Sequence, residues 1–286
     1  MMVLRRMLDL ATSDWQKAAA WLLIGAIFFA MRSCEYLETN TKEEFRRTKI
    51  LRLRNIAFRK NGRRLSHQDP NLHTADLVII TFEFQKNDKR DISIHMFATT
   101  DSQLNPVVAW NNTVRRVWSY PNASVDSKVC EFFNPASKSR ELLKTVHVRD
   151  YLRSIVDLIG EDILGFTKND IGLHSIRSGG AMAMFLSGTS VVIIMRVGRW
   201  SSEAFLEYIR EQVENFTTGV SQNMLAFECY FVLGRNNNNT ASSKKSPQKS
   251  SQNNESGPIE VPFDVSFSNM AINDSAGLTK SFGRRK

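Results

Sequence analysis

A histidine and an arginine stand three residues apart in Leu173-His174-Ser175-Ile176-Arg177, and a tyrosine, Tyr208, follows about thirty residues later. On a helix, this spacing places His174 and Arg177 on one face. A guanidinium can donate two parallel hydrogen bonds to phosphate oxygens, an imidazole can transfer a proton near neutral pH, and an activated hydroxyl can attack phosphorus. The set indicates phosphate chemistry that does not require a metal.

Each of these residues also has an ordinary structural explanation. His174 fits a helix cap, and Arg177 fits a surface ion pair. Tyr208 stands among residues whose spacing marks the apolar face of a helix, where aromatic side chains usually pack in a core. That face consists of Phe205, Ile209, Val213 and Phe216. A tyrosine hydroxyl, with an ordinary pKa of about 10, needs cationic neighbours and a base before it attacks phosphorus.

A second arginine is a candidate for such a neighbour. Arg32 directly follows the apolar run of residues 18–31. A charge at the end of a buried segment must find a partner or reach water. Arg32 therefore pairs with Glu35, extends to solvent, or binds an anion such as phosphate, and the sequence leaves these alternatives open.

The elements that must position these residues follow from hydrophobic periodicity. Residues 13–37 predict a helix with Ser13 as its N-cap. Three alternating segments predict a small three-stranded antiparallel sheet with turns at 59–64 and 85–90. The strand segments are residues 50–58, 76–84 and 91–97, and the further helices are expected at 105–120, 147–159, 175–187 and 190–197. The expected fold class is α+β and mostly helical.

Charge and cysteine content narrow the partners. The formal net charge is +9 and the sequence pI about 9.6, an excess that favours polyanions such as nucleic acid. The three cysteines, Cys34, Cys130 and Cys229, are scattered and odd in number. This pattern argues against a disulfide framework or a zinc site.

Two segments require separate interpretation. The fourteen apolar or small residues at 18–31 are fewer than the roughly twenty that cross a bilayer, so a buried core helix is expected there. After residue 234 the composition turns to Asn, Ser, Lys and Gln. This composition predicts a polar, basic and disordered tail over residues 235–286.

The order and flanking residues of three segments resemble the catalytic domain of the tyrosine recombinase (phage integrase) family. The segments are Ala30-Met31-Arg32-Ser33-Cys34-Glu35-Tyr36-Leu37, Leu173-His174-Ser175-Ile176-Arg177-Ser178-Gly179-Gly180, and Gly198-Arg199-Trp200 followed by Tyr208-Ile209-Arg210. The likeness is strongest to eukaryotic mobile-element recombinases of the Crypton type and covers residues 13–233. Each motif alone is modestly specific, whereas the ordered set is strongly so.

The resemblance implies a role for four residues. Arg32 and Arg177 would hold the non-bridging oxygens of a scissile DNA phosphate and stabilise its transition state. His174 would serve in proton transfer and phosphate binding. Tyr208 would attack phosphorus and form a 3′-phosphotyrosyl link, releasing a 5′-hydroxyl that can later rejoin the strand. Because the covalent link conserves the bond energy, neither a cofactor nor a metal is expected.

Two further family positions have competing candidates. The family places a lysine, the general acid for the leaving 5′-oxygen, in a turn of its small sheet, and here Lys86 is favoured over Lys60 and Lys89. The position nine residues before the tyrosine, usually histidine or tryptophan, is Arg199. Trp200, one residue later, is favoured for its indole N–H, while Arg199 would supply an additional positive charge.

The resemblance also implies an architecture and partners. Residues 1–234 would form the catalytic domain, without the helical core-binding domain that usually precedes it, and residues 235–286 the tail. The expected partner is double-stranded DNA, bound by a homo-oligomer, a tetramer, in the nucleus, with no membrane. Two alternatives remain: an inactive DNA-binding remnant, in which residues 175–197 form a helix-turn-helix, and a membrane-anchored protein that uses residues 18–31.

Overall fold

The computed structural model describes residues 1–41, 43–45, 47–85 and 90–201 of the 286-residue chain. Contacts divide the chain into two compact units, Met1–Glu228 and Cys229–Lys286, and all described residues belong to the first. The predicted domain boundary at residue 234 lies outside the described residues. The helices in the described part are α1 (Met2–Asp9), α2 (Asp14–Phe28), α3 (Pro106–Trp118), α4 (Thr145–Ile159), α5 (Glu161–Leu164), α6 (Leu173–Leu186) and α7 (Val191–Gly198). The strands are β1 (Ile56–Lys60), β2 (Arg63–Leu65), β3 (Leu77–Phe82), β4 (Ile92–Phe97), β5 (Glu131–Asn134) and β6 (Ser139–Leu142).

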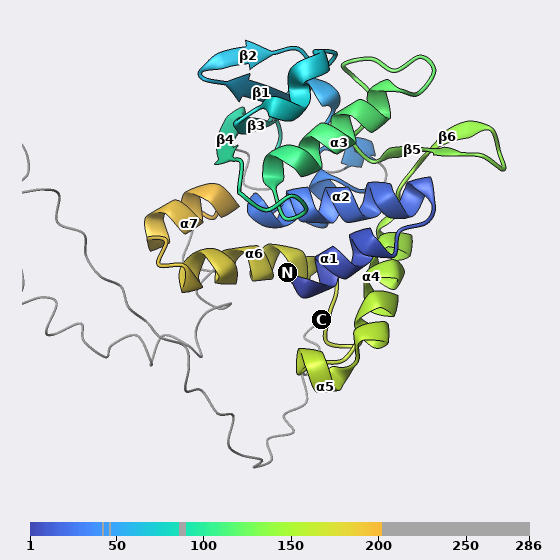
Figure 1. The fold of residues 1–286 in the computed structure, drawn as a ribbon, viewed down its shortest axis with the longest axis vertical. Helices are drawn as coiled ribbons and strands as arrows, with labels where there is room; N and C mark the ends of the chain where they lie inside the picture. The colour runs from blue at the N-terminus through green and yellow to red at the C-terminus, as the bar shows by residue number, and fades with distance from the viewer. Residues whose placement is uncertain (42, 46, 86–89, 202–286) are drawn as a thin grey trace, which may run out of the picture. The chain divides into compact units, whose positions relative to one another are not determined.

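Helix α2 forms the centre of the core. It begins where the sequence predicts, because Ser13 and Gln16 form a capping box: the Gln16 N–H donates to Ser13 Oγ and the Ser13 N–H donates to Gln16 Oε1. The helix is apolar around most of its circumference and packs against α1, α3 and α6 (Figure 1). This packing confirms the predicted core helix. Within the described residues, no helix is both long and apolar enough to span a membrane.

The predicted extension of this helix to residue 37 is wrong. The helix ends at Phe28, Ala30 adopts a φ of 42°, and a short 3-10 turn follows at Ser33–Glu35. The carbonyls of Phe29 and Ala30 accept hydrogen bonds from arginine side chains far away in sequence. Such tertiary caps satisfy carbonyls that a longer helix would pair internally, and periodicity cannot reveal them.

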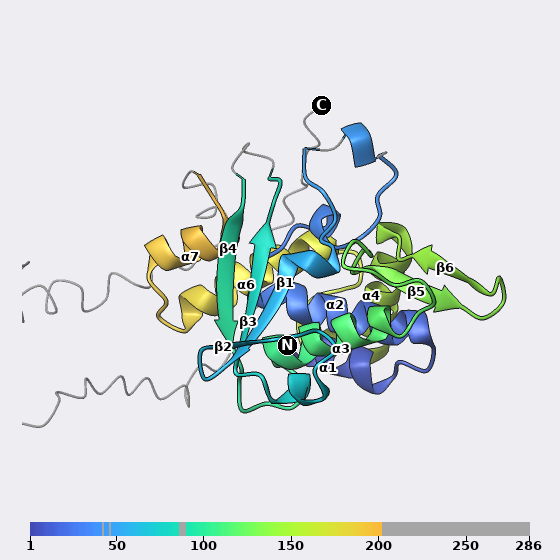
Figure 2. The ribbon, with the colours of Figure 1, turned by 90° about the horizontal axis from the view of Figure 1, so that it is seen from above.

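The sheet contains the three predicted strands and one more. Its order is β2-β1-β3-β4, and every neighbouring pair is antiparallel (Figure 2). The first strand was predicted to begin at residue 50, but it begins at Ile56 because Leu53–Asn55 forms a 3-10 turn. The predicted number of three strands is wrong, since the additional strand β2 pairs with β1. Asn61 and Gly62 have φ values of 49° and 78°, as a tight two-residue hairpin turn requires. The chain therefore returns to the sheet at Arg63.

The bounds of four further helices agree closely with those predicted from the sequence. α3, α4, α6 and α7 lie within two residues of their predicted bounds, which confirms a mostly helical α+β fold. The helices α1 and α5 and the hairpin of β5 and β6 are not predicted from the sequence. In both views α7 and this hairpin lie on opposite sides of the described body (Figures 1 and 2).

Helix α6, which carries His174 and Arg177, lies very close to α2. A Cβ atom built on Gly180 would stand 2.2 Å from the carbonyl oxygen of Ile27. Only a residue without a side chain permits this approach. The contact sets the middle of α6 against the end of α2.

Candidate active site

A hollow of about 420 Å³ brings together three separate chain segments. They are the residues just after α2, the first turn of α6, and the residue two positions after α7. The lining residues are Met31, Arg32, Ser33, Cys34, Leu173, His174, Arg177 and Trp200. Four of the six predicted site residues, Arg32, His174, Arg177 and Trp200, therefore line one hollow.

Arg177 is buried, with 2% of its surface exposed, and is held by the backbone of two other elements. Its Nη1 donates to the carbonyl of Ala30, and its Nη2 donates to the carbonyl of Gly198 at 2.7 Å. The guanidinium carbon lies 4.1 Å from the ring centroid of Trp200, a cation–π distance. The surface ion pair considered for Arg177 is therefore wrong. A guanidinium carries five N–H groups, so these bonds are compatible with a phosphate contact.

Arg32 is held by a buried carboxylate. Glu35 is 1% exposed; its Oε1 accepts from Arg32 Nη1 at 3.2 Å and its Oε2 from the Arg32 backbone N–H at 2.8 Å. The Arg32 side chain itself is 24% exposed and lines the hollow. Pairing with Glu35 and facing an anion are thus compatible, although the sequence presents them as alternatives.

Arg199 completes this ion cluster from beneath the hollow. Its Nη2 donates to Glu35 Oε2 at 2.7 Å, and the two side chains are 0% and 1% exposed. Its Nη1 donates to the carbonyls of Phe29 at 3.1 Å and Val197 at 3.0 Å. Burial lowers the pKa of this guanidinium, while the Glu35 carboxylate opposes that shift. Arg199 and Arg177 together cap the C-terminal end of α2.

The choice between Arg199 and Trp200 depends on the backbone after α7. Arg199 has a left-handed φ of 57°, and its guanidinium lies over the Phe82 ring, whereas the Trp200 ring lies against the Arg177 guanidinium. Trp200 lines the hollow that contains Arg32 and His174, and Arg199 does not; both residues line a neighbouring hollow with Ile92 and Ser93. Of the two residues, Trp200 is the one next to the candidate phosphate-binding groups.

His174 is the second residue of α6 and is exposed toward the hollow. Its pKa lies below the ordinary histidine value, first because the ring is partly desolvated and then because Arg177 and Arg32 are nearby positive charges. The free protein therefore holds a neutral imidazole at pH 7. A neutral imidazole can accept a proton from an attacking hydroxyl.

The other candidates from the sequence are Tyr208 and three lysines. Tyr208, Lys86 and Lys89 lie outside the described residues. Lys60 ends β1 and stands opposite Arg63, in the hairpin turn rather than in the hollow. The pairing of Arg32 with Glu35 was one of the alternatives that the sequence left open, whereas the second partner of Glu35, the buried Arg199, was not predicted.

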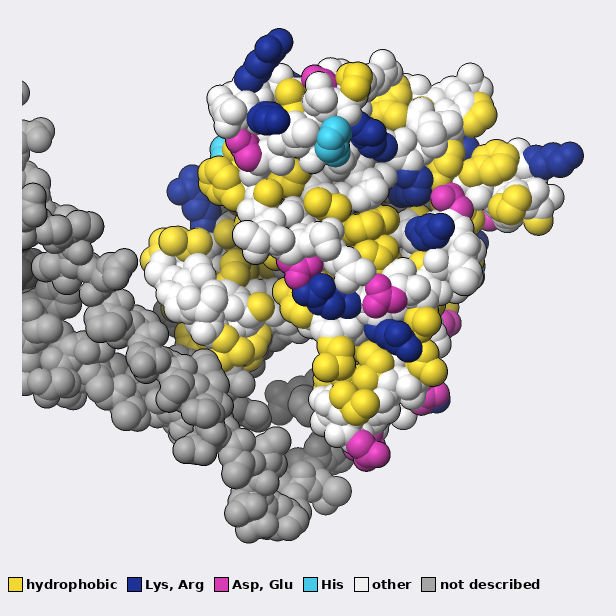
Figure 3. Space-filling view, viewed as in Figure 1, with side chains coloured by type: hydrophobic (Ala, Val, Ile, Leu, Met, Phe, Trp, Pro, Cys, Tyr) yellow, Lys and Arg dark blue, Asp and Glu magenta, His cyan; other side chains and the backbone are white. Residues whose placement is uncertain are grey.

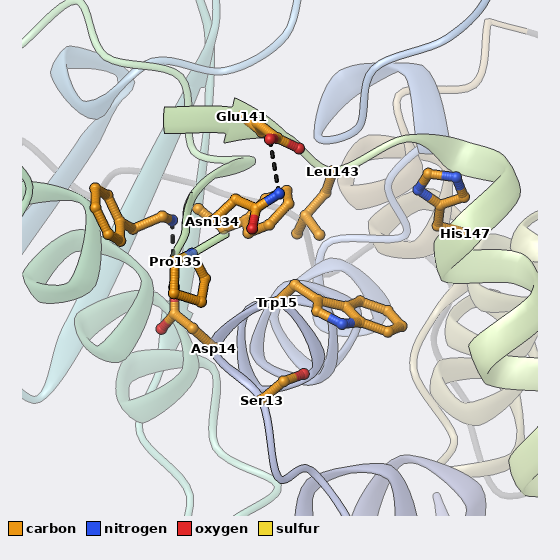
Figure 4. A pocket seen from close by; sticks show the side chains of 10 residues that line it. Ser13, Asp14, Trp15, Asn134, Pro135, Glu141, Leu143 and His147 are labelled. Atoms are coloured by element: carbon orange, nitrogen blue, oxygen red, sulfur yellow. Dashed lines mark hydrogen bonds between the residues drawn. The ribbon is translucent and has the colours of Figure 1, made fainter. Parts of the chain in front are cut away.

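A second, larger hollow of about 500 Å³ lies between the start of α2 and the β5–β6 hairpin (Figure 4). Its lining residues include Asp14, Trp15, Glu141 and His147, and no arginine or lysine. Glu141 accepts a hydrogen bond from Asn134 Nδ2 at 2.7 Å. Carboxylates on its wall disfavour a phosphate there, so the smaller hollow is the better candidate site.

Comparisons with known proteins give matches only among solved structures. No protein-family model matches the chain, and no curated protein sequence matches it. One similar structure is the XerH site-specific recombinase bound to palindromic difH substrate in a post-cleavage complex, with a TM-score of 0.47 and 14% sequence identity over 77% of this chain. A second is XerH bound to difH substrate in a pre-cleavage complex, with a TM-score of 0.45 and 14% identity over 76% of this chain. The chain spans about half the length of these proteins, 50% and 49%.

Proposed function

We propose that this protein cleaves and rejoins DNA strands through a covalent 3′-phosphotyrosyl intermediate, as a tyrosine recombinase does. The observation that supports the proposal is the convergence of Arg32, His174, Arg177 and Trp200 on one hollow. Arg32 and His174 are separated by more than half of the described chain, so their meeting is a property of the fold. Two arginines, a neutral histidine and an indole form a set of donors and a base suited to a phosphodiester.

The two arginines would bind the non-bridging oxygens of the phosphate. The Arg177 guanidinium is fixed by two backbone carbonyls and the Trp200 ring, and Arg32 is fixed by Glu35. Fixed donors stabilise the charge that develops in the transition state without reorganising during the reaction. Trp200 would add an indole N–H, and Lys86 would protonate the leaving 5′-oxygen.

In the proposed step, the Tyr208 hydroxyl oxygen bonds to phosphorus as the bond to the 5′-oxygen breaks. The tyrosine proton passes to neutral His174, and the Lys86 ammonium gives a proton to the departing 5′-oxygen. Attack by a 5′-hydroxyl on the phosphotyrosyl link reverses these transfers and rejoins a strand. The number of phosphodiester-type bonds is unchanged throughout, so no external energy source is required.

Suicide DNA substrates test this proposal. The purified chain is incubated with a library of duplexes nicked next to each possible cleavage site, so that the released fragment diffuses away, and covalent protein–DNA adducts are detected after denaturation. An adduct is expected with the parent chain and is expected to disappear in Tyr208→Phe. Tyr120→Phe is the matched control, because the Tyr120 hydroxyl donates a hydrogen bond to Asp14 Oδ2 and does not line the hollow.

The same assay separates the proposed roles. Arg177→Lys keeps the charge but loses the two-pronged donor geometry, so adduct formation should fall by about 100-fold or more. An adduct that persists in Tyr208→Phe would refute the nucleophile assignment.

A catalytically inactive DNA-binding remnant of a mobile element is the second candidate. It is favoured by the helix pair α6 and α7, which are joined through residues 187–190 with Gly188 at a φ of 78°. DNA binding without an adduct on any substrate would support this candidate. A nuclear location and a tetramer on DNA belong to the proposal of an active recombinase, and the net positive charge supports the DNA partner.

A further inference from the structure

The tip of the β1–β2 hairpin concentrates positive charge on a rigid ribbon. Four basic side chains, Arg59, Lys60, Arg63 and Arg64, flank the Asn61-Gly62 turn, and all four are exposed. We call these four residues the basic tip. Figure 3 shows Lys and Arg side chains at the end of the molecule formed by β1 and β2.

The strand register sets these charges directly against each other. Arg59 pairs with Arg64, and Lys60 pairs with Arg63. Like charges in directly opposed positions of an antiparallel pair are destabilising. Among the described residues, no ion pair neutralises any member of the basic tip. The two opposed like-charge pairs therefore destabilise the hairpin, and the contacts of the folded chain do not account for their presence.

The surroundings of the basic tip also suit an anion. Asp76 is the nearby carboxylate, and its Oδ2 accepts the Asn61 backbone N–H at 2.7 Å, so it stabilises the turn itself. Arg64 lines a hollow of about 480 Å³ together with His67, Trp118 and Arg54, and the Arg54 guanidinium is itself paired with Glu83 and Asp126. The positive charge of Arg64 contributes to a lowered pKa of His67, for which burial is the main cause.

The basic tip is a different surface from the candidate active site. Arg59 pairs with Leu77 at the start of β3, whereas residues 86–89, which contain Lys86, follow the other end of that strand. The five steps from Leu77 to Phe82 span about 17 Å, equivalent to about five base pairs of duplex DNA. A duplex lying along the sheet would therefore meet the basic tip several base pairs away from the other end of β3, and no residue of the basic tip lines the hollow of the candidate active site.

We propose that the basic tip binds the phosphate backbone of double-stranded DNA. This inference rests on the proposed function only in its choice of DNA as the polyanion. Exposed cations on a hairpin tip can donate to phosphate oxygens from either face of the ribbon, and backbone contacts of this kind fix register without reading sequence.

The salt dependence of DNA affinity tests the proposal. Binding of a labelled random-sequence duplex is measured at several salt concentrations for the parent and for Lys60→Gln/Arg63→Gln. Each lost phosphate contact reduces the slope of log K against log salt by about 0.9, so the double variant should lose about 1.8 and bind roughly tenfold or more weakly at 0.1 M salt. The thermal midpoint should stay equal or rise, because an opposed like-charge pair is removed.

The control removes the same charge elsewhere. Lys138→Gln/Lys168→Gln changes two exposed lysines, on the β5–β6 turn and before α6, and should leave the slope unchanged. An equal loss of slope in this control would show a net-charge effect and overturn the proposal. So would an unchanged slope in Lys60→Gln/Arg63→Gln, or tighter binding of the parent chain to duplex RNA than to DNA.

The outcome is independent of strand cleavage. A slope that falls in the tip variant, while no adduct forms with any suicide substrate, would support the basic tip and refute the recombinase proposal. Normal adduct formation by the parent chain, together with an unchanged salt slope in the tip variant, would support the recombinase proposal and refute DNA binding by the basic tip.

Discussion

The two arginines of the candidate site are held by different means. Arg177 donates to backbone carbonyls of two elements, so its position depends on the packing of α2, α6 and α7. Arg32 depends on Glu35, whose carboxylate is shared with the buried Arg199. Breaking a buried ion pair by removing one partner typically costs about 3–5 kcal/mol. Arg199 is therefore better described as part of the framework than as a group that contacts phosphate.

The pH profile of strand cleavage should report His174. In the free protein its pKa lies below the ordinary value of about 6.5, so the decline of kcat/KM with falling pH should have its midpoint below about pH 6.5. A bound phosphodiester offsets the charges of Arg32 and Arg177 and raises the pKa of His174 in the complex. Single-turnover cleavage at saturating DNA should therefore begin to decline at a higher pH than kcat/KM.

The variant His174→Gln tests whether His174 is the group whose protonation reduces cleavage at low pH. The variant keeps a hydrogen-bonding side chain but cannot titrate, so its residual cleavage should lack the acid limb. An acid limb that survives in His174→Gln would assign proton transfer to a different residue.

At the scale of elements, the approach of α6 to α2 sets the geometry of the site. A Cβ on Gly180 would lie 2.2 Å from the Ile27 carbonyl oxygen, a backbone atom that cannot rotate away. Gly180→Ala should therefore destabilise the fold by about 1–3 kcal/mol, the usual cost of overpacking. The measurement is urea unfolding followed by tryptophan fluorescence.

The neighbouring glycine is the matched control. Gly179 lies on the same helix, and a Cβ there meets no atom within 4 Å. Gly179→Ala should be neutral or stabilising by up to about 1 kcal/mol, because alanine favours a helix more than glycine. Equal stability of the two variants would mean that α6 does not rest on α2 as closely as described.

Most elements were predictable from sequence either because their apolar residues recur with a helical period, as in α3 and α4, or because they form a continuous apolar run, as in α2 and β3. The missed strands are short: β2 has three residues and β5 and β6 have four each, too few for a pattern. The end of α2 was missed because Arg177 and Arg199 cap it from more than a hundred residues away. The family resemblance, and not spacing alone, pointed to the pocket residues Arg32, His174 and Arg177. It left Arg199 and Trp200 as competing candidates, and of these two only Trp200 lines the hollow with Arg32.

At the scale of the whole molecule, stability and positive charge are distributed differently along the chain. The buried core of the described part extends from Val3 to Val197 and includes all layers around α2. Residues 235–286 contain eight Lys or Arg and four Asp or Glu, so they carry +4 of the net charge of +9. Their low apolar content predicts little contribution to a core.

Deletion of residues 235–286 should separate these two properties. The thermal midpoint should change by no more than about 2 °C, because the composition of the deleted residues predicts no contribution to a core. Affinity for random-sequence duplex DNA should fall, with a shallower salt slope, because fewer cations neutralise phosphates. Adduct yield at saturating DNA should be unchanged, since every proposed catalytic residue is retained. A large loss of thermal stability would contradict the predicted boundary at residue 234, and would mean that the C-terminal residues complete the fold rather than only adding charge to it.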